Sequence, residues 1–305
     1  MKKVINRPSD VVSEMLEGMA KADPRLTYYR EAEVIARREK TAGKVGLVSG
    51  GGSGHEPAHA GYVGKGMLDA AVAGNVFASP SPDRILKGIE EADTGNGVLL
   101  IIKNYSGDIM NFGMAKDLAE MDGHLVDSVV VKDDVAVPDS TFSTGRRGIA
   151  GTVFVHKIAG AKAETGASLQ KVKEIAEKTI ANVRSMGMAM SPCTLPGVGK
   201  PGFELGEDEI EIGMGIHGEP GVARTGVQSA KELAKTLLEK ILADYDYSGS
   251  EAVSYTHLDV YKRQDHGAAL WFLFGDLVHH IVRKIKIIGT VDRKRSKDPF
   301  AVKTL

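Results

Sequence analysis

The amino-acid sequence predicts an α/β protein of two domains, an N-terminal domain with an open α/β sheet followed by a smaller α/β domain. Two apolar runs, Val45–Val48 and Val98–Ile102, each lead into a polar loop that contains glycine, ahead of a helical pattern. This order of buried strand, loop and helix is typical of a parallel sheet covered by helices. After Gly187 the pattern changes, and every second residue from Ile210 to Ile216 is apolar, which predicts a half-exposed strand in the second domain.

The remaining elements follow from periodicity and from helix start and stop signals. A helix is predicted to begin at Pro8-Ser9-Asp10 and to end before Pro24, and Ser81-Pro82 marks the start of another. Further helices are expected over residues 109–121, 149–164, 168–186 and 227–243, and further strands over 70–76 and 126–131.

The domain boundary is placed near residue 184. The first domain then covers residues 1–183 and carries a glycine-loop substrate site, and the second covers 184–248. Residues 249–305 form an atypical tail, and its segment 254–264 resembles a fragment that recurs in assembled sequence data. We therefore interpret the tail as foreign and the second domain as truncated or altered. The alternatives are a packed terminal helix and a basic amphipathic helix for a membrane surface or partner.

Composition excludes several classes of protein. The 305 residues are 42% hydrophobic and 26% charged, as in a globular protein, and the net charge of −1 gives no electrostatic basis for binding nucleic acid. A single cysteine, Cys193, excludes an internal disulfide framework. The first residues do not resemble a signal peptide, and no apolar run reaches the roughly 18–20 residues that span a bilayer. We expect a cytoplasmic protein with no membrane or nucleic-acid partner.

The glycine-rich stretch after the first strand predicts a ligand site. Three glycines, Gly50 to Gly52, follow Ser49 and lead to Ser53, Gly54 and His55. Glycine lets a ligand approach the backbone closely, and open α/β sheets bind ligands beyond the carboxyl ends of their strands. His55 is therefore expected at the rim of a site. The alternative is an ordinary tight turn with a surface histidine.

Two other motifs match known signatures without the context that those signatures need. His55–His59 fits H-E-x-x-H, but Pro57 lies between the histidines, where a zinc-binding helix would be continuous. Gly213–Gly218 fits G-x-G-x-x-G, but Glu219-Pro220-Gly221 follows in place of a helix. A Walker A loop is absent from the sequence. We expect no metal site and no nucleotide site in this chain.

Four residues remain, each at a strand end or in a glycine loop: His55, Lys103, Asp108 and His217. Each has a simpler explanation. A lone histidine is usually a surface or satisfied core residue, Asp108 could cap the following helix, and Lys103 could be solvated.

Several long motifs resemble one family. Gly50–Pro57, Gly61–Gly64, Leu99–Asp108, Asp133–Val137, Gly145–Gly148 and Gly213–Gly221 together resemble the dihydroxyacetone-binding subunits of dihydroxyacetone kinases, of the phosphoenolpyruvate-dependent type. The resemblance runs in order from Met1 to about Tyr247 and stops from about residue 249.

The resemblance implies a role for each candidate residue. It implies that His217 bonds covalently to dihydroxyacetone as a hemiaminal, and that His55 and Asp108 are the acid/base pair. It also implies substrate contacts by Gly52, Ser53, Gly54, His55, Lys103 and Asp108. The residue types suit this chemistry, because a neutral imidazole has a lone pair that can add to a ketone carbon.

The resemblance also implies partners. This chain would bind no cofactor, and ADP or ATP with Mg²⁺ would lie on a separate nucleotide-binding kinase subunit that a phosphoryl-carrier subunit recharges. A homodimer is expected. The alternative is a non-catalytic dihydroxyacetone sensor that coactivates a transcription regulator. A sensor needs to capture the ketone but needs no base, so the presence of both His55 and Asp108 favours the enzyme.

Overall fold

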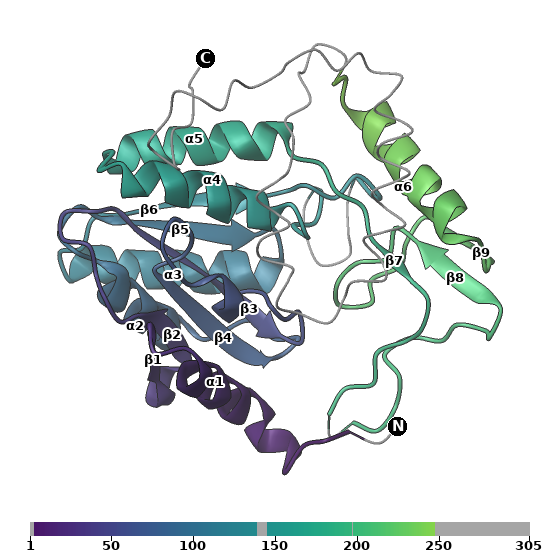
Figure 1. Cartoon of the computed structure of the whole chain (residues 1–305), viewed down its shortest axis with the longest axis horizontal. Coiled ribbons are helices and arrows are strands. Elements are labelled where there is room, and N and C mark those ends of the chain that lie inside the picture. The colour runs from purple at the N-terminus through teal and green to yellow at the C-terminus, as the bar shows by residue number, and fades with distance from the viewer. Residues whose placement is uncertain (1–2, 139–144, 197, 248–305) are drawn as a thin grey trace, which may run out of the picture. The chain divides into compact units, whose positions relative to one another are not determined.

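A mixed six-stranded sheet forms the centre of the fold (Figure 1). The computed structural model describes residues 3–138, 145–196 and 198–247. The strands lie in the order β1-β2-β4-β3-β5-β6. Four of them are parallel: β3 (Gly46–Ser53), β4 (Ala70–Val76), β5 (Val98–Lys103) and β6 (Val126–Val131). The hairpin of β1 (Leu26–Tyr29) and β2 (Val34–Arg37) adds an antiparallel edge. The predicted α/β class is confirmed.

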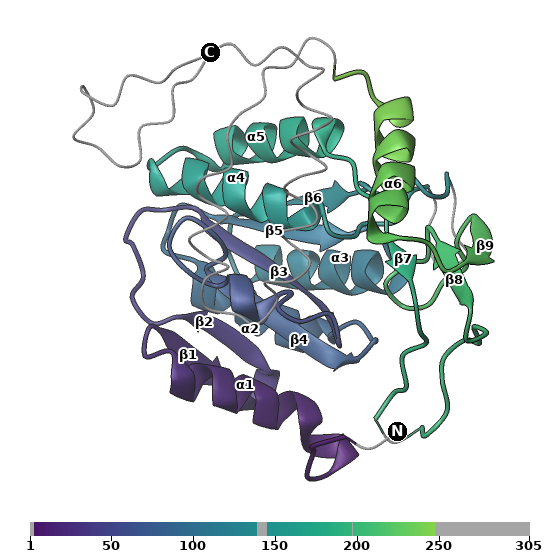
Figure 2. The same cartoon turned by 45° about the vertical axis from the view of Figure 1, so that its right-hand side comes forward.

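Helices cover both faces of this sheet (Figures 1 and 2). Apolar side chains of α1 (Val11–Ala22), α4 (Thr152–Glu164) and α5 (Leu169–Asn182) pack in one core cluster. Those of α2 (Pro82–Ala92) and α3 (Ser106–Met121) pack in a second cluster on the other face. The central strands are apolar on both sides because helices bury both of their faces.

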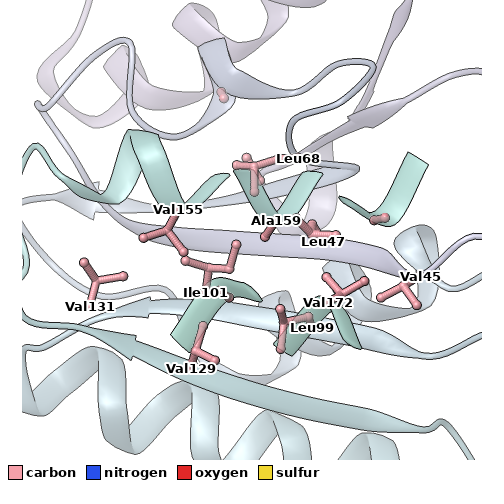
Figure 3. Packing of buried hydrophobic residues seen from close by; sticks show 14 of the residues in the cluster. Val45, Leu47, Leu68, Leu99, Ile101, Val129, Val131, Val155, Ala159 and Val172 are labelled. Carbon is pink, nitrogen blue, oxygen red and sulfur yellow. The ribbon is translucent and has the colours of Figure 1, made fainter. Parts of the chain in front are cut away.

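The first cluster shows how the strand pattern produces this packing (Figure 3). Leu99 and Ile101 are alternate residues of β5 and point to the same face, where they meet Val155 and Val172 of the helices. Leu100, between them, belongs to the second cluster. The continuous apolar run that predicted β5 is therefore two alternating sets of residues, each buried by the helices on its own face of the sheet.

A second sheet has three antiparallel strands in the order β7-β8-β9. They are β7 (Met188–Ala189), β8 (Glu209–Ile212) and β9 (Ala223–Gly226), and α6 (Ala230–Asp244) follows. The strand predicted to reach Ile216 ends at Ile212, because Gly213 adopts a left-handed backbone with φ of 79°. The residues after it form a loop that carries His217. Short 3₁₀ turns occur at Pro8–Asp10, Arg30–Ala32 and Ala60–Tyr62.

Strand β3 is longer than predicted and includes the glycine run. It pairs with β4 as far as Ser53, with Gly50 opposite Val72 and Gly52 opposite Gly74. A β-carbon on Gly50 would lie 2.4 Å from the Val72 carbonyl oxygen. The glycines therefore allow β3 and β4 to lie close together at the end of the sheet where the ligand site is predicted.

The contacts divide the chain into two compact units, one of Met1–Val227 with Glu239–Tyr245 and another that includes Gln228–Leu238. Both sheets and all the candidate site residues belong to the first unit. The domain boundary near residue 184 stays a prediction, and the predicted tail lies outside the described residues. Across residues 3–138, 145–196 and 198–247, none of the helices has the length and apolar character to cross a bilayer.

Candidate active site

The site lies at the carboxyl ends of the parallel strands. His55 follows β3, Phe77 follows β4, and Lys103 is the last residue of β5. After β3 the chain forms β4 on one side, and α2 then carries it to β5 on the other side of β3. Such a change of direction leaves a crevice beyond the strand ends, which is where open α/β sheets bind ligands.

The His55 ring packs between two other rings. It stacks on Phe77 with a centroid distance of 4.9 Å and an interplanar angle of 18°, and it meets His217 at 4.8 Å and 78°. Burial, with the nearby charge of Lys103, lowers the pKa of His55 to about 3. The ring is therefore neutral at physiological pH. Its Nε2 atom is buried and has no hydrogen-bond partner among the described residues.

His217 is held by a buried glutamate in its own loop. Its Nδ1 atom lies 3.0 Å from Glu219 Oε1, and its backbone N–H donates to Glu219 Oε2 at 2.9 Å. An ionised carboxylate can only accept hydrogen bonds, so Nδ1 carries a proton, and in the neutral ring Nε2 then holds the lone pair. The Tyr105 ring meets the imidazole nearly at right angles, with centroids 4.6 Å apart.

Glu219 stays ionised in this position. Only 2% of its side chain is exposed, and burial by itself would raise its pKa. The hydrogen bonds from His217 outweigh burial, so the pKa of Glu219 is below its ordinary value. The result is a fixed negative charge behind the histidine ring.

Lys103 and Asp108 are both buried beside Gly51. Lys103 Nζ and Asp108 Oδ2 each lie 3.5 Å from the position that a β-carbon on Gly51 would occupy. Burial lowers the pKa of Lys103 and raises that of Asp108, and the attraction between the two charges opposes both shifts. Two simpler explanations are wrong: Lys103 is only 3% exposed, and Tyr105 occupies the N-cap position of α3 in place of Asp108.

The Ser53 hydroxyl and the Gly54 N–H of the glycine loop both bond within the protein. The Ser53 hydroxyl donates to the Gly74 carbonyl at 2.8 Å and so faces β4. The Gly54 N–H donates to the Glu56 carboxylate at 3.1 Å. A β-carbon on Gly52 or Gly54 would overlap Phe77, at 2.8 and 2.6 Å respectively. These glycines therefore allow Phe77 to pack against the loop and against His55.

The H-E-x-x-H residues do not form a zinc-peptidase site. Residues 54–59 are bends and turns, without the helix that this signature needs. His59 is buried away from His55, with its Nδ1 3.2 Å from His156 Nε2 and 3.3 Å from Ser49 Oγ. In the described part of the chain no three His, Cys, Asp or Glu side chains are grouped in a way that could hold a metal.

The G-x-G-x-x-G match also lacks its context, because residues 213–218 lead into the loop before β9 and no helix begins there.

The structure brings the predicted residues His55, Lys103, Asp108 and His217 to one end of the sheet. It adds Phe77 and Glu219, which the sequence did not single out. Glu219 could have been found from the sequence, since it lies two residues after His217 in the same loop. Phe77 could not have been found in this way, because a single phenylalanine after a strand is common.

Comparison with known proteins places these residues in a family. Residues 17–259 match the Dak1 domain. The chain is 60% identical over 245 residues to the dihydroxyacetone-binding subunit of PTS-dependent dihydroxyacetone kinase 1 from Listeria innocua, covering 80% of this chain and 74% of that protein.

Two solved structures are also similar. The dihydroxyacetone kinase of C. freundii superposes with a TM-score of 0.76 at 38% identity and covers 86% of this chain, which spans only 50% of that longer protein. A dihydroxyacetone kinase operon co-activator superposes with a TM-score of 0.73 at 38% identity, covering 78% of this chain and 73% of its own. The chain therefore belongs to the Dak1 domain family, as a kinase subunit of the type that includes the dihydroxyacetone-binding subunits of dihydroxyacetone kinases.

Proposed function

We propose that this chain binds dihydroxyacetone covalently, as a hemiaminal on His217, and presents its terminal hydroxyl for phosphorylation to dihydroxyacetone phosphate. The observation that carries the proposal is the meeting of His217 with His55, whose ring centroids lie 4.8 Å apart at the carboxyl edge of the sheet. The names of the relatives support the substrate, and the free lone pair on His217 Nε2 supports the covalent step.

In the capture step, His217 Nε2 attacks the ketone carbon and forms a C–N bond, while the carbonyl π electrons move to the oxygen. The ring gives up its Nδ1 proton to Glu219, which passes it to solvent, and one proton returns from water to the oxygen. The hemiaminal is then neutral, and Glu219 ends ionised as it began. His55 cannot act as an imidazolium acid, because its pKa is about 3. We assign it a hydrogen bond to the developing oxygen, the kind of interaction that stabilises such a charge. The unpaired His55 Nε2 supports a polar ligand here.

Covalent capture would give selectivity that size alone cannot. Dihydroxyacetone and glycerol differ little in volume, and a pocket distinguishes near-isosteres by only about 10- to 200-fold. Glycerol has no carbonyl group and cannot form the adduct.

In the transfer step, Asp108 would accept the proton of the terminal hydroxyl as that oxygen attacks phosphorus. Its raised pKa makes it a stronger base than an exposed aspartate. Lys103 would donate to the substrate oxygens, and the backbone of Gly52, Ser53 and Gly54 would line the other side. The Ser53 hydroxyl is assigned no contact because it bonds the Gly74 carbonyl.

The same proposal includes partners. The phosphoryl group would come from a separate nucleotide-binding kinase subunit that holds ADP or ATP with Mg²⁺ and is recharged by a phosphoryl-carrier subunit. We also propose a homodimer and a cytoplasmic location, as expected from the sequence.

A second candidate is a non-catalytic sensor, which the similarity to the operon co-activator favours. Both functions need His217. Only the enzyme needs a base at position 108, so phosphorylation of dihydroxyacetone in the presence of a nucleotide-bearing partner subunit separates the two.

Native mass spectrometry tests the capture step. The wild-type chain should gain the mass of one dihydroxyacetone and should gain nothing from glycerol. His217→Ala should remove the gain. His124→Ala is the matched control, because His124 also bonds a carboxylate, Asp93, at 2.7 Å but lies outside the site. An adduct that survives His217→Ala would show that another residue is the nucleophile.

A further inference from the structure

One arginine lies completely buried behind the His217 loop. Arg147 is 0% exposed, and its Nε and Nη2 atoms both lie 2.7 Å from Asp134 Oδ2. Asp134 is also 0% exposed and follows β6. Burying an ion pair costs free energy that the attraction between its charges does not always return. The buried Arg147–Asp134 pair is therefore weak evidence for a stabilising role, and the other contacts of Arg147 indicate a second role.

The other donors of Arg147 bind the loop that carries His217. Nη2 donates to the Gly213 carbonyl at 2.7 Å, and Nη1 donates to the Pro220 carbonyl at 3.4 Å. Gly213 begins the loop and Pro220 lies near its end, so one rigid guanidinium holds both ends. Lysine could not replace it, because an ammonium group lacks the planar fork of donors.

Arg147 also lies close to the carboxylate that orients His217. A β-carbon on Gly215 would be 2.6 Å from Arg147 Nη1 and 2.1 Å from Glu219 Oε2, so both atoms lie over the same glycine. The backbone N–H of Gly215 donates to the Glu219 carbonyl at 2.9 Å, which closes the loop around them. Charges therefore alternate from Asp134 through Arg147 to Glu219, and the histidine ring comes next.

We propose that Arg147, held by Asp134, is a positioning residue that sets the place and orientation of the His217–Glu219 pair relative to the end of the larger sheet. This inference rests on the proposed function, since it concerns the same nucleophile. Arg147 itself does not touch the substrate. It acts by tying a loop of the three-stranded sheet to the segment that follows β6 of the larger sheet.

A purely structural role would predict a different outcome, and Arg37 provides the comparison. Arg37 is 13% exposed and binds Asp69 and Glu164 at 3.0 and 2.8 Å, far along the sheet from the strand ends that carry the site. If Arg147 only stabilises the fold, replacing either arginine with lysine should lower thermal stability and leave capture of dihydroxyacetone unchanged.

The experiment compares Arg147→Lys with Arg37→Lys in the full chain. Capture is measured by native mass spectrometry over a range of dihydroxyacetone concentrations, and thermal stability is measured in parallel. We expect Arg147→Lys to weaken capture about 100-fold, the effect of a misplacement of roughly 1 Å, and Arg37→Lys to leave it unchanged. Methylguanidinium should partly restore capture by Arg147→Ala, because it can occupy the vacated position. Asp134→Asn provides a second variant, expected to weaken capture in the same direction.

Three outcomes decide between the proposals. Wild-type capture in a folded Arg147→Lys protein overturns the positioning role. Equal losses in Arg147→Lys and Arg37→Lys, with no rescue by methylguanidinium, overturn it too. Failure of the wild-type chain to capture dihydroxyacetone overturns the proposed function instead. In that case the positioning claim is judged from NMR contacts between the His217 and Tyr105 rings without ligand, which Arg147→Lys should weaken and Arg37→Lys should not.

Discussion

Lys103 and Asp108 both lie beside the position of a side chain that Gly51 lacks. The Nζ atom of the lysine and the Oδ2 atom of the aspartate are each 3.5 Å from the point that a β-carbon on Gly51 would occupy. Two buried groups of opposite charge thus border a space that a glycine in β3 leaves open. A small polyhydroxy ligand could fill this space and bond to both groups.

Gly51→Ala should place a methyl group in that space. We expect kcat/KM for dihydroxyacetone to fall about 10- to 200-fold, the effect of one added carbon in a fitted pocket. Gly123→Ala is the control, because Gly123 also has a positive φ, of 90°, and no atom lies within 4 Å of its β-carbon position. Steady-state kinetics with the partner subunit measures both variants. Equal activity of Gly51→Ala and the control would mean that the substrate does not lie between Lys103 and Asp108.

Glu219→Gln should slow capture. Glutamine keeps the size of the side chain but can also donate a hydrogen bond to His217 Nδ1, which would move the ring proton to Nε2 and remove the nucleophilic lone pair. We expect the rate of adduct formation to fall by about 10²- to 10⁴-fold, as when a carboxylate that orients a catalytic histidine is replaced by an amide. Asp93→Asn changes the carboxylate that bonds His124 and should have no effect. An unchanged rate in Glu219→Gln would contradict the assigned tautomer.

Asp108→Asn should separate capture from transfer. The adduct should still form, because His217 and Glu219 are untouched. Turnover with the nucleotide-bearing partner should fall by about 10²- to 10⁴-fold, the usual contribution of a general base. The two measurements are native mass spectrometry and the rate of product formation. Normal turnover in this variant would remove Asp108 from the mechanism.

Acid should destabilise the fold through buried histidines. Burial lowers the pKa of His156 to about 3, whereas an unfolded histidine has a pKa of about 6.5. Below pH 6.5 the unfolded chain therefore binds one more proton at this position than the native protein does. The free energy of unfolding should fall by about 1.4 kcal/mol per pH unit from this residue alone as pH drops from 6.5 towards 3. Denaturant unfolding at several pH values would show a shallower slope in His156→Gln. Equal slopes in the variant and the wild type would mean that His156 is protonated in the native state.

Much of the larger sheet could be predicted, because its signals are local. The run Val98–Ile102 is apolar without interruption, and such a run bounded by turn residues is typical of a strand buried on both faces. The hairpin of β1 and β2 was not predicted, since Leu26–Tyr29 and Val34–Arg37 are short and mix apolar with polar residues. Their strand conformation comes from pairing with each other and with β4.

The candidate site was predictable only in part, for the same reason. His55 and Asp108 lie next to glycine-bearing loops at strand ends, so their place at the sheet edge follows from the strand pattern. The meeting of His217 with Phe77 and Tyr105 depends on how a loop of the smaller sheet reaches the larger one, and no local pattern encodes that contact. Arg147 could not be singled out either, because its proposed role depends on hydrogen bonds to the carbonyl groups of Gly213 and Pro220, which are distant from it in the sequence.

The proposed nucleophile, His217, lies in the loop between β8 and β9 of the smaller sheet, and the proposed base, Asp108, lies in α3, directly after β5 of the larger sheet. On the proposed mechanism, neither sheet alone supplies both residues. Labelling by dihydroxyacetone would therefore report on joint folding of the two, and could be used to count correctly assembled molecules in a refolding mixture without any assay of turnover.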